Sequence, residues 1–273
     1  MLDPTGLYES SRLAAGYAFA RPPVHVRVME LAARRLGLTG PVSRALDIGC
    51  GAGLSTAALD LLAAHVVGLE PSRVMLQHCG TTAPRAAFVN ARAEDLPFRA
   101  GAFDLVTAAG ALNYVDLGRV LPGVARVLSS EGSLVIYDFS SGRRARGDDG
   151  RLAAWFEAFE QRYPFPPGYA LDVCAIDYAS AGLRLAEYER FEVGVTVTPE
   201  AYLAYVLTES NVELAVAAGT PEPAIRDWCA AGLAPVFAGR ALEILFEGYI
   251  CRVRRLAHRG NASPTPSIPG RRG

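Results

Sequence analysis

The stretch Ala45-Leu46-Asp47-Ile48-Gly49-Cys50-Gly51-Ala52-Gly53-Leu54-Ser55-Thr56 decides the fold of this chain. An apolar run ends at a carboxylate, three glycines then alternate with small residues, and an Ala/Leu-rich helical stretch follows. This pattern predicts a strand, a tight glycine turn and a helix, which together form the first half of a βαβ nucleotide site.

The spacing of these glycines separates two classes of nucleotide ligand. A dinucleotide fingerprint has Gly or Ala where Leu54 stands, whereas the third glycine here comes one residue earlier. A carboxylate just before the turn would also repel a pyrophosphate. It suits a ligand that carries an ammonium and a sulfonium, which describes S-adenosylmethionine. We therefore expect this cofactor to meet the turn at close backbone approach, at Asp47, Gly49, Cys50, Gly51 and Gly53.

A second carboxylate, Glu70, stands 23 residues after Asp47, at the end of a short β-branched run. That distance fits one helix and a return strand, with a new helix opening at Pro71 or Ser72. At the end of such a strand, Glu70 can accept hydrogen bonds from two ribose hydroxyls. The alternative is an exposed glutamate that caps the next helix.

A third motif covers Asn90 to Phe98 and is followed by the apolar run Phe103-Asp104-Leu105-Val106. Together the three motifs resemble the class I S-adenosylmethionine-dependent methyltransferases, and most of all the small-molecule type found in ubiquinone and menaquinone biosynthesis. The resemblance covers residues 42–140 well and the remainder weakly.

The resemblance implies contacts for the rest of the cofactor. A backbone N–H at Ala93 and the acid Glu94 would read the adenine edge, with Asp95 as the alternative acid. An aromatic residue and an arginine in the N-terminal segment, Tyr17 and Arg21, would close over the site. Further cofactor contacts are expected at Pro71, Met75, Ala109 and Gly110.

The alternation of patterns along the chain predicts an α/β fold with a doubly wound, mostly parallel, seven-stranded, Rossmann-like sheet. Helical insertions would form a substrate cover. The last two strands would pair as an antiparallel edge hairpin. The expected strands are 43–48, 65–70, 86–90, 103–108, 133–138, 184–197 and 242–253, and the expected helices are 54–64, 72–79, 116–129, 151–162, 199–217 and 221–231.

The same patterns predict four parts. Residues 1–40 would form an N-terminal helical cover, with a break at Pro22-Pro23, and 41–140 the cofactor-binding core. Residues 141–255 would complete the sheet and carry the substrate cover, after a polar loop at 140–150, and 256–273 would be a disordered basic tail. The aromatic side chains of the insertions could line a pocket or form the insertion's own core; they are Trp155, Phe156, Phe159, Tyr163, Phe165, Tyr169, Tyr178, Tyr202 and Tyr205.

Methyl transfer mainly requires that acceptor and methyl group are held in line, and a base is needed only when the acceptor keeps its proton until late. Many members of the resembling family have a histidine where Asn113 and Tyr114 stand here, so the usual base is absent. The remaining candidates for acceptor contacts or base are Tyr114, Asp138 and His25. No acid pair with metal-site spacing follows Asp138, so we expect no metal.

Composition excludes several other functions. All 27 basic residues are arginine, which excludes mechanisms that need a lysine. Residues 252–273 hold six arginines and no acid, which leaves 21 basic against 28 acidic residues elsewhere and argues against a nucleic-acid substrate. No 18-residue apolar run indicates a membrane span, and the five scattered cysteines indicate a cytoplasmic protein without a disulfide framework.

These observations favour a methyltransferase of secondary or quinone-like metabolism that uses S-adenosylmethionine. Its acceptor would be a small, largely apolar or aromatic molecule, methylated at oxygen or carbon. One alternative is an enzyme that binds the cofactor for other chemistry, such as a cyclase or decarboxylase, and another is a non-catalytic cofactor-binding partner. The sequence leaves the oligomeric state open, with a homodimer as one option.

Overall fold

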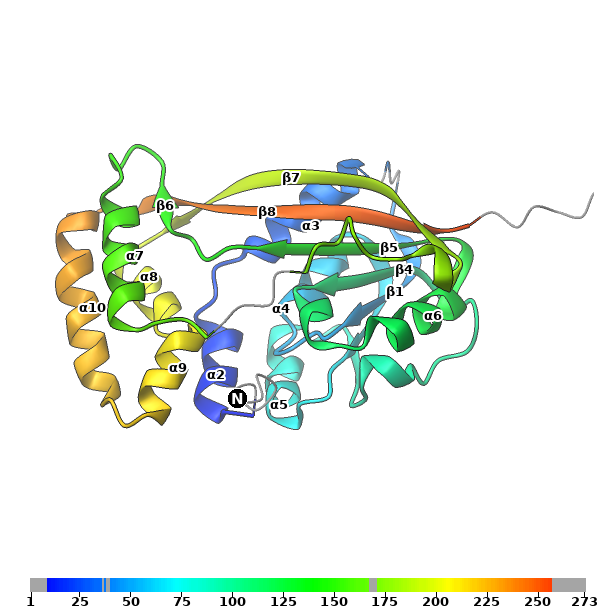
Figure 1. The fold of residues 1–273 in the computed structure, drawn as a ribbon, viewed down its shortest axis with the longest axis horizontal. Helices are drawn as coiled ribbons and strands as arrows, with labels where there is room; N and C mark the ends of the chain where they lie inside the picture. The colour runs from blue at the N-terminus through cyan, green and yellow to red at the C-terminus, as the bar shows by residue number, and fades with distance from the viewer. Residues whose placement is uncertain (1–8, 36, 38–39, 167–170, 257–273) are drawn as a thin grey trace, which may run out of the picture.

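The computed structural model describes residues 9–35, 37, 40–166 and 171–256. Strands and helices alternate in that part as the sequence predicted (Figure 1). The strands are β1 (Val42–Ile48), β2 (Ala63–Leu69), β3 (Ala87–Val89), β4 (Phe103–Ala109), β5 (Leu128–Phe139), β6 (Arg144–Ala145), β7 (Leu183–Val197) and β8 (Leu242–Arg255). The α-helices are α2 (Ser11–Phe19), α3 (Val24–Arg35), α4 (Leu54–Ala58), α5 (Arg73–Thr82), α6 (Leu117–Val127), α7 (Arg151–Arg162), α8 (Pro199–Val206), α9 (Ser210–Ala217) and α10 (Glu222–Phe237).

The described strands form one mixed sheet in the order β3-β2-β1-β4-β5-β8-β6, and β7 pairs with the other edge of β8. Strands β1 to β5 are parallel, whereas β8 runs antiparallel to β5, β6 and β7. Ile48 is in register with both Leu69 and Ala108, so the ends of β1, β2 and β4 lie side by side. The predicted α/β fold with a mostly parallel sheet is confirmed, and ligands of such folds bind at this carboxyl edge.

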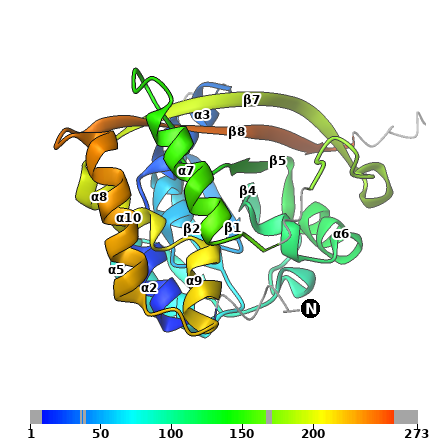
Figure 2. The same ribbon diagram turned by 60° about the vertical axis from the view of Figure 1, so that its left-hand side comes forward.

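The antiparallel hairpin β7–β8 continues beyond that carboxyl edge. The last residue of β5, Phe139, pairs with Gly248, so β8 residues 242–247 extend past the end of the parallel strands. Helices α7 to α10 gather around the far end of this hairpin, on the side of α2 and α5 (Figure 2). The hairpin therefore holds the inserted helices beside the carboxyl edge of the parallel strands.

Three local predictions differ from the structure. The predicted loop 140–150 contains the two-residue strand β6, which pairs with Ile244 and Leu245 of β8 and is too short to show a periodicity. The predicted helix 54–64 is α4 followed by a 3-10 turn at Leu59–Leu61, and β2 begins at Ala63. The predicted helix 199–217 is two helices, α8 and α9, with a break at 207–209.

The N-terminal segment forms two helices that are separated at Pro22-Pro23, as the sequence indicated. The buried residues of α3 join a core on one face of the sheet together with the inserted helices. The other face is covered by α6 and its own core. Residues 1–8 and 257–273, which include nearly all of the predicted tail, lie outside the described part. No described helix is both long and apolar enough to span a bilayer.

Candidate cofactor and acceptor site

A cavity of about 730 Å³ opens at the carboxyl ends of β1, β2, β4 and β5. Its volume lies in the range of about 300–1,000 Å³ that is usual for small-molecule sites. All of the predicted cofactor residues except Asp47 and Gly53 line it, and so do the three predicted acceptor-site residues. The lining residues from both sets are Tyr17, His25, Gly49, Cys50, Gly51, Glu70, Pro71, Met75, Ala93, Glu94, Ala109, Gly110, Tyr114 and Asp138.

Asp47 does not face the cavity, which corrects its predicted direct contact with the ligand. The side chain is fully buried and accepts hydrogen bonds from Ser55 Oγ at 2.6 Å, Thr56 Oγ1 at 2.8 Å and Thr107 Oγ1 at 2.8 Å. Burial raises the pKa of Asp47, against the effect of these three hydroxyls. The carboxylate thus links the start of α4 and strand β4 to the end of β1. It supports the segment that follows the glycine turn without lining the cavity.

Gly53 also lies behind the cavity, and packing explains why it is a glycine. It precedes α4 with a φ of 94°, and a Cβ there would lie 2.6 Å from Thr82 Oγ1 of α5. The role of this third glycine is therefore a close approach between the turn and α5.

Glu70 faces the cavity and supports the glycine turn at the same time. Its carboxylate accepts hydrogen bonds from the backbone N–H of Gly51 at 3.0 Å and from that of Ser72 at 2.9 Å. Burial, and then the nearby negative charge of Asp47, raises the pKa of Glu70, although the two N–H groups act in the opposite direction. A carboxylate held in this way keeps lone pairs available for hydroxyl donors in the cavity.

The structure distinguishes between the two acids that follow Ala93. Glu94 lines the cavity and accepts a hydrogen bond from the backbone N–H of Asp116 at 3.2 Å. Asp95 is exposed and pairs with Arg119 at 2.7 Å. Of these two acids, only Glu94 is placed to meet a ligand.

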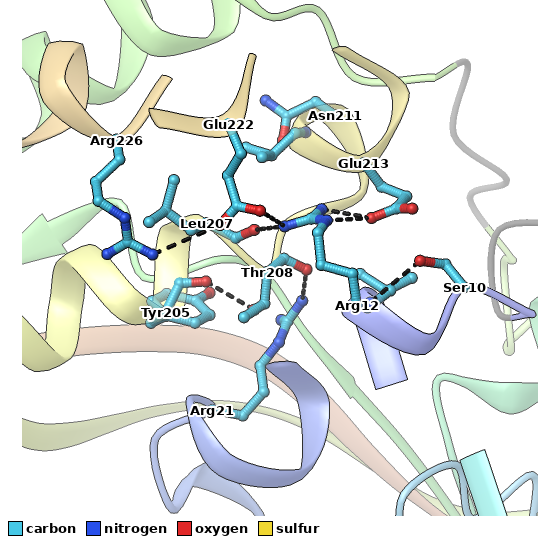
Figure 3. Close-up of polar contacts among 12 residues, drawn as sticks. Ser10, Arg12, Arg21, Tyr205, Leu207, Thr208, Asn211, Glu213, Glu222 and Arg226 are labelled. Carbon is cyan, nitrogen blue, oxygen red and sulfur yellow. Dashed lines mark hydrogen bonds and ion pairs between the residues drawn. The ribbon is translucent and has the colours of Figure 1, made fainter. Parts of the chain in front are cut away.

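The N-terminal cover reaches the cavity through Tyr17 and Arg21. The guanidinium carbon of Arg21 lies 4.1 Å from the ring centroid of Tyr17 and 5.2 Å from that of Tyr205 on α8. Arg21 also donates to the backbone oxygen of Thr208 at 2.9 Å, in the break between α8 and α9 (Figure 3). It pairs with Glu209, in the same break, at 3.5 Å. The arginine therefore joins the cover to the inserted helices.

Comparisons with known proteins find methyltransferases. Residues 46–136 match the family model described as a methyltransferase domain. This segment runs from β1 into β5 and carries the glycine turn, Glu70 and Glu94. An uncharacterized methyltransferase of Synechocystis sp. is 39% identical over 101 residues, which are 36% of this chain and 48% of that protein. A demethylmenaquinone methyltransferase of Clavibacter sepedonicus is 40% identical over 102 residues, which are 36% of this chain and 42% of that protein.

The structural comparison extends the likeness beyond the matched segment. A proposed type II methyltransferase from Anaeromyxobacter dehalogenans superposes with a TM-score of 0.66 at 22% identity, over 84% of this chain and 97% of that one. At this identity the likeness concerns the fold. The chain spans about half the length of the curated relatives it matches. These similarities agree with the predicted resemblance to methyltransferases and with S-adenosylmethionine as the expected cofactor.

The residues of the methyltransferase domain fit that cofactor. Gly51 has a φ of 53°, and a Cβ there would meet nothing within 4 Å, so the cavity comes directly up to its backbone. Glu70 offers an oxygen acceptor beside it. Gly49 has a different reason to be glycine, because its Cβ would lie 2.5 Å from the Cβ of Ala111.

His25 of α3 approaches the methyltransferase domain from the N-terminal cover and lines the cavity. Its Nδ1 lies 2.9 Å from the phenol oxygen of Tyr137, in the middle of the sheet. Burial, and secondly the positive charge of Arg21, lowers the pKa of His25 from 6.5 to about 4. The imidazole is therefore neutral at physiological pH.

Asp138 faces the same cavity from the end of β5. Its Oδ2 accepts from Asn113 Nδ2 at 3.1 Å and its Oδ1 from the backbone N–H of Phe139 at 2.8 Å. Burial raises the pKa of Asp138, and these two donors act against the rise. Tyr114 also lines the cavity but is 41% exposed, at its rim.

Most aromatic side chains of the insertions pack against one another. Trp155 stacks on Phe159 with centroids 5.3 Å apart and meets Tyr202 edge-on at 6.2 Å. Among the predicted aromatic residues that the structure describes, Tyr205 alone lines the cavity, and Tyr169 lies outside the described residues. Of the two alternatives for these side chains, core packing therefore holds for most of the described ones and pocket lining for Tyr205.

Several cavity-lining residues were not predicted from the sequence. Phe139 and Phe246 supply apolar lining, and Glu9 and Asn113 supply polar lining. The three hydroxyls around Asp47 could have been found, because a buried carboxylate in a strand requires donors and Ser55-Thr56 follows the turn directly.

Proposed function

We propose that this chain is an S-adenosylmethionine-dependent methyltransferase that acts on a small molecule. The observation that carries the proposal is the Glu70 carboxylate, which faces the cavity and is fixed by the N–H of the glycine turn. The proposed cofactor-binding residues are residues that line the cavity. Glu70 would accept from the ribose hydroxyls, Ala93 and Glu94 would meet the adenine, and the backbone at Gly49 to Gly51 would face the methionine part.

The acceptor would occupy the part of the cavity between the end of β5 and the N-terminal cover. Phe139, Tyr205 and Phe246 supply an apolar lining there, and Asp138 supplies a carboxylate. Bound cofactor supplies an activated methyl group on a sulfonium, so the chain itself has to hold the acceptor in line and, where the acceptor keeps its proton until late, to remove that proton. Asp138 is the proposed base, with Asn113 holding one of its oxygens, and the apolar lining favours methylation at oxygen or carbon.

A second candidate is cofactor-dependent chemistry other than methyl transfer. The observation in its favour is that Asn113 and Tyr114 line the cavity at the position where many members of the resembling family have a histidine. The two candidates differ in whether a methylated small molecule is formed. With methyl-labelled cofactor and a cell extract as the source of acceptor, a methyltransferase transfers label to a small molecule, whereas the alternative leaves it on the cofactor.

The first experiment is calorimetric binding of S-adenosylmethionine and S-adenosylhomocysteine to wild type, Glu70→Ala and Glu131→Ala. Charged hydrogen bonds contribute about 1.5–3 kcal/mol each, so Glu70→Ala should weaken binding by about 10-fold or more. Glu131 is exposed and outside the cavity, so its variant should bind as wild type does. Equal affinity of the two variants, or no binding by wild type, overturns the proposal. The pair Glu94→Ala and Asp95→Ala tests the adenine contact in the same way.

A further inference from the structure

Tyr137 is a buried phenol that contacts the cavity-lining residue His25 and that the proposed cofactor and acceptor contacts do not use. It lies on β5 one residue before Asp138 and is 1% exposed. Its hydroxyl has one hydrogen bond within the described part of the chain, to His25 Nδ1 at 2.9 Å. The ring of His25 also meets the rings of Tyr137 and Phe139 edge-on, at centroid distances of 5.8 and 5.2 Å.

The protons of this pair can be assigned from the contacts. A neutral imidazole has one nitrogen that donates and one that accepts, whereas a phenol can do both. Burial keeps the pKa of Tyr137 well above its ordinary value, so the phenol retains its proton. That buried proton needs an acceptor, and Nδ1 of His25 is the acceptor that the described residues provide. The phenol therefore donates to Nδ1, and the imidazole proton is on Nε2.

We propose that His25 is a hydrogen-bond donor, through Nε2, to an oxygen of the acceptor molecule, and that Tyr137 is the positioning residue that fixes this tautomer. The inference rests on the proposed function in one respect, namely that an acceptor occupies the cavity. It assigns His25 a binding contact in place of the role of base.

The surroundings of His25 indicate the chemical class of this oxygen. The guanidinium of Arg21 adds a positive charge near the imidazole, although Glu209 pairs with it at 3.5 Å. A neutral donor beside a cation favours a carbonyl or an ionised hydroxyl over a protonated amine. Asp138, which follows Tyr137 on β5, faces the cavity with a proton-accepting carboxylate. A donor and a carboxylate in one cavity fit an acceptor that carries a carbonyl oxygen and an ionisable O–H or C–H.

The test is the tautomer of His25, measured by long-range ¹H–¹⁵N correlation spectra of ¹⁵N-histidine-labelled protein at pH 7. The chain has four histidines, and the signals of His25 are those that His25→Gln removes. We expect a neutral ring with the proton on Nε2. In Tyr137→Phe the Nδ1 signal should move toward the value of a tautomer mixture. Tyr178→Phe is the matched control, because that buried phenol donates to the Val173 oxygen at 3.0 Å and should leave His25 unchanged. A proton on Nδ1, or a charged ring, overturns the proposal.

A second readout uses the methyl-labelled cofactor with a cell extract. His25→Gln keeps an N–H donor and should retain at least a tenth of the labelled product, whereas His25→Leu should lose more than 90% of it. Equal product from the two variants contradicts a donor role. Failure of the proposed function gives a different pattern, in which wild type itself forms no product while the spectra still show the Nε2 proton. Calorimetry with S-adenosylhomocysteine should give wild-type affinity for both variants, which shows that they fold.

Discussion

Two carboxylates support the glycine turn in different ways. Asp47 accepts from Ser55 and Thr56, at the start of α4, and does not reach the cavity. Glu70 accepts from Gly51 and faces the cavity. Both are buried acids with a raised pKa, so their ionised forms depend on the donors that surround them. The first fixes the turn, and the second both fixes it and presents an oxygen to a ligand.

The sequence could place both acids at strand ends, but it could not tell which one faces the cavity. Asp47 is the last residue but one of β1, where its side chain points to the hydroxyls of α4 and β4. Glu70 comes one residue after the end of β2, where backbone N–H groups replace side chains as donors. One residue of register decides the direction of a side chain in a strand, and the predicted bounds of these strands are not accurate to one residue.

Burial of Asp47 predicts a specific pH dependence of stability. Its pKa is raised in the folded state, so the folded protein holds this proton to higher pH than the unfolded chain does. Its contribution is therefore greatest below the unfolded value of 3.8 and is lost as the pH rises through the raised folded value. Asp47→Asn removes this titration and can still bond the three hydroxyls.

The measurement is urea denaturation of wild type and Asp47→Asn between pH 4 and pH 7. As the pH rises over this interval, the free energy of unfolding should fall less for the variant than for wild type. Each tenfold difference between the acid dissociation constants of Asp47 in the folded and unfolded states corresponds to about 1.4 kcal/mol. Asp95→Asn, at an exposed carboxylate, should follow wild type. Parallel curves for wild type and Asp47→Asn would contradict the assigned origin of the shift.

Gly49 and Gly51 should respond differently to the same substitution. Both have a positive φ, at 66° and 53°, so alanine costs about 1–2 kcal/mol of stability at either position. At Gly49 the new methyl would also lie 2.5 Å from the Cβ of Ala111. At Gly51 it would enter open space on the cavity side.

We therefore expect Gly49→Ala to lose more unfolding free energy than Gly51→Ala, by about 1–3 kcal/mol because of overpacking. Gly51→Ala should instead weaken S-adenosylhomocysteine binding by about tenfold or more, which is about 1.4 kcal/mol. Urea denaturation and calorimetry on both variants check the two effects. Equal stability of the two variants would show that the Ala111 contact is relieved by movement of its segment.

Helix α2 connects the methyltransferase domain to the inserted helices. On one side Ala14 and Ala18 pack against Ala52 of the glycine turn and Met75 of α5. On the other side Arg12 donates through Nε to Glu213 at 2.8 Å and through a terminal nitrogen to the oxygen of Leu207 at 3.0 Å (Figure 3). The helix therefore contacts both the turn that would hold the cofactor and the break between α8 and α9.

Loss of Arg12 should loosen this connection. Arg12→Ala leaves the Glu213 carboxylate, 12% exposed, without its arginine partner, and we expect a loss of about 1–3 kcal/mol of unfolding free energy. Because α2 also carries Tyr17 at the cavity, the dissociation rate of S-adenosylhomocysteine should rise, as measured by stopped-flow displacement. Arg27→Ala, at an exposed pair with Glu30, is the control and should change neither quantity. An unchanged dissociation rate in Arg12→Ala would show that α2 does not hold the ligand in place.

At the scale of elements, the sequence predicted the parts with strong periodicity and missed the irregular ones. Helices α3 and α6, and the hairpin strands β7 and β8, follow from their apolar spacing. The break between α8 and α9 shows no Gly or Pro at 207–209, and its contacts come from Arg12 and Arg21, about 190 residues earlier. Tertiary bonds of this kind leave no local signal in the sequence.

For the whole molecule, the inserted helices share one core with the sheet. Buried residues of α7, α8 and α10 pack in the same cluster as Val135 and Tyr137 of β5 and Phe246 of β8. Phe156 of α7 and Phe237 of α10 are almost fully buried there. A core that continues from the sheet into the insertion leaves the insertion no separate hydrophobic centre, and we expect it to unfold together with the sheet.

The two tryptophans of the chain allow a direct test of this expectation, because Trp155 and Trp228 both lie in the insertion. Their fluorescence reports unfolding of the insertion alone, whereas far-ultraviolet circular dichroism reports the sheet and all helices. The two urea transitions should coincide in midpoint and slope. Saturating S-adenosylhomocysteine should move both midpoints upward together, since a ligand at 100 times its Kd stabilises the folded state by about 2.7 kcal/mol. A fluorescence transition that precedes the dichroism change, or that stays in place when the ligand is added, would show that the insertion folds as an independent unit.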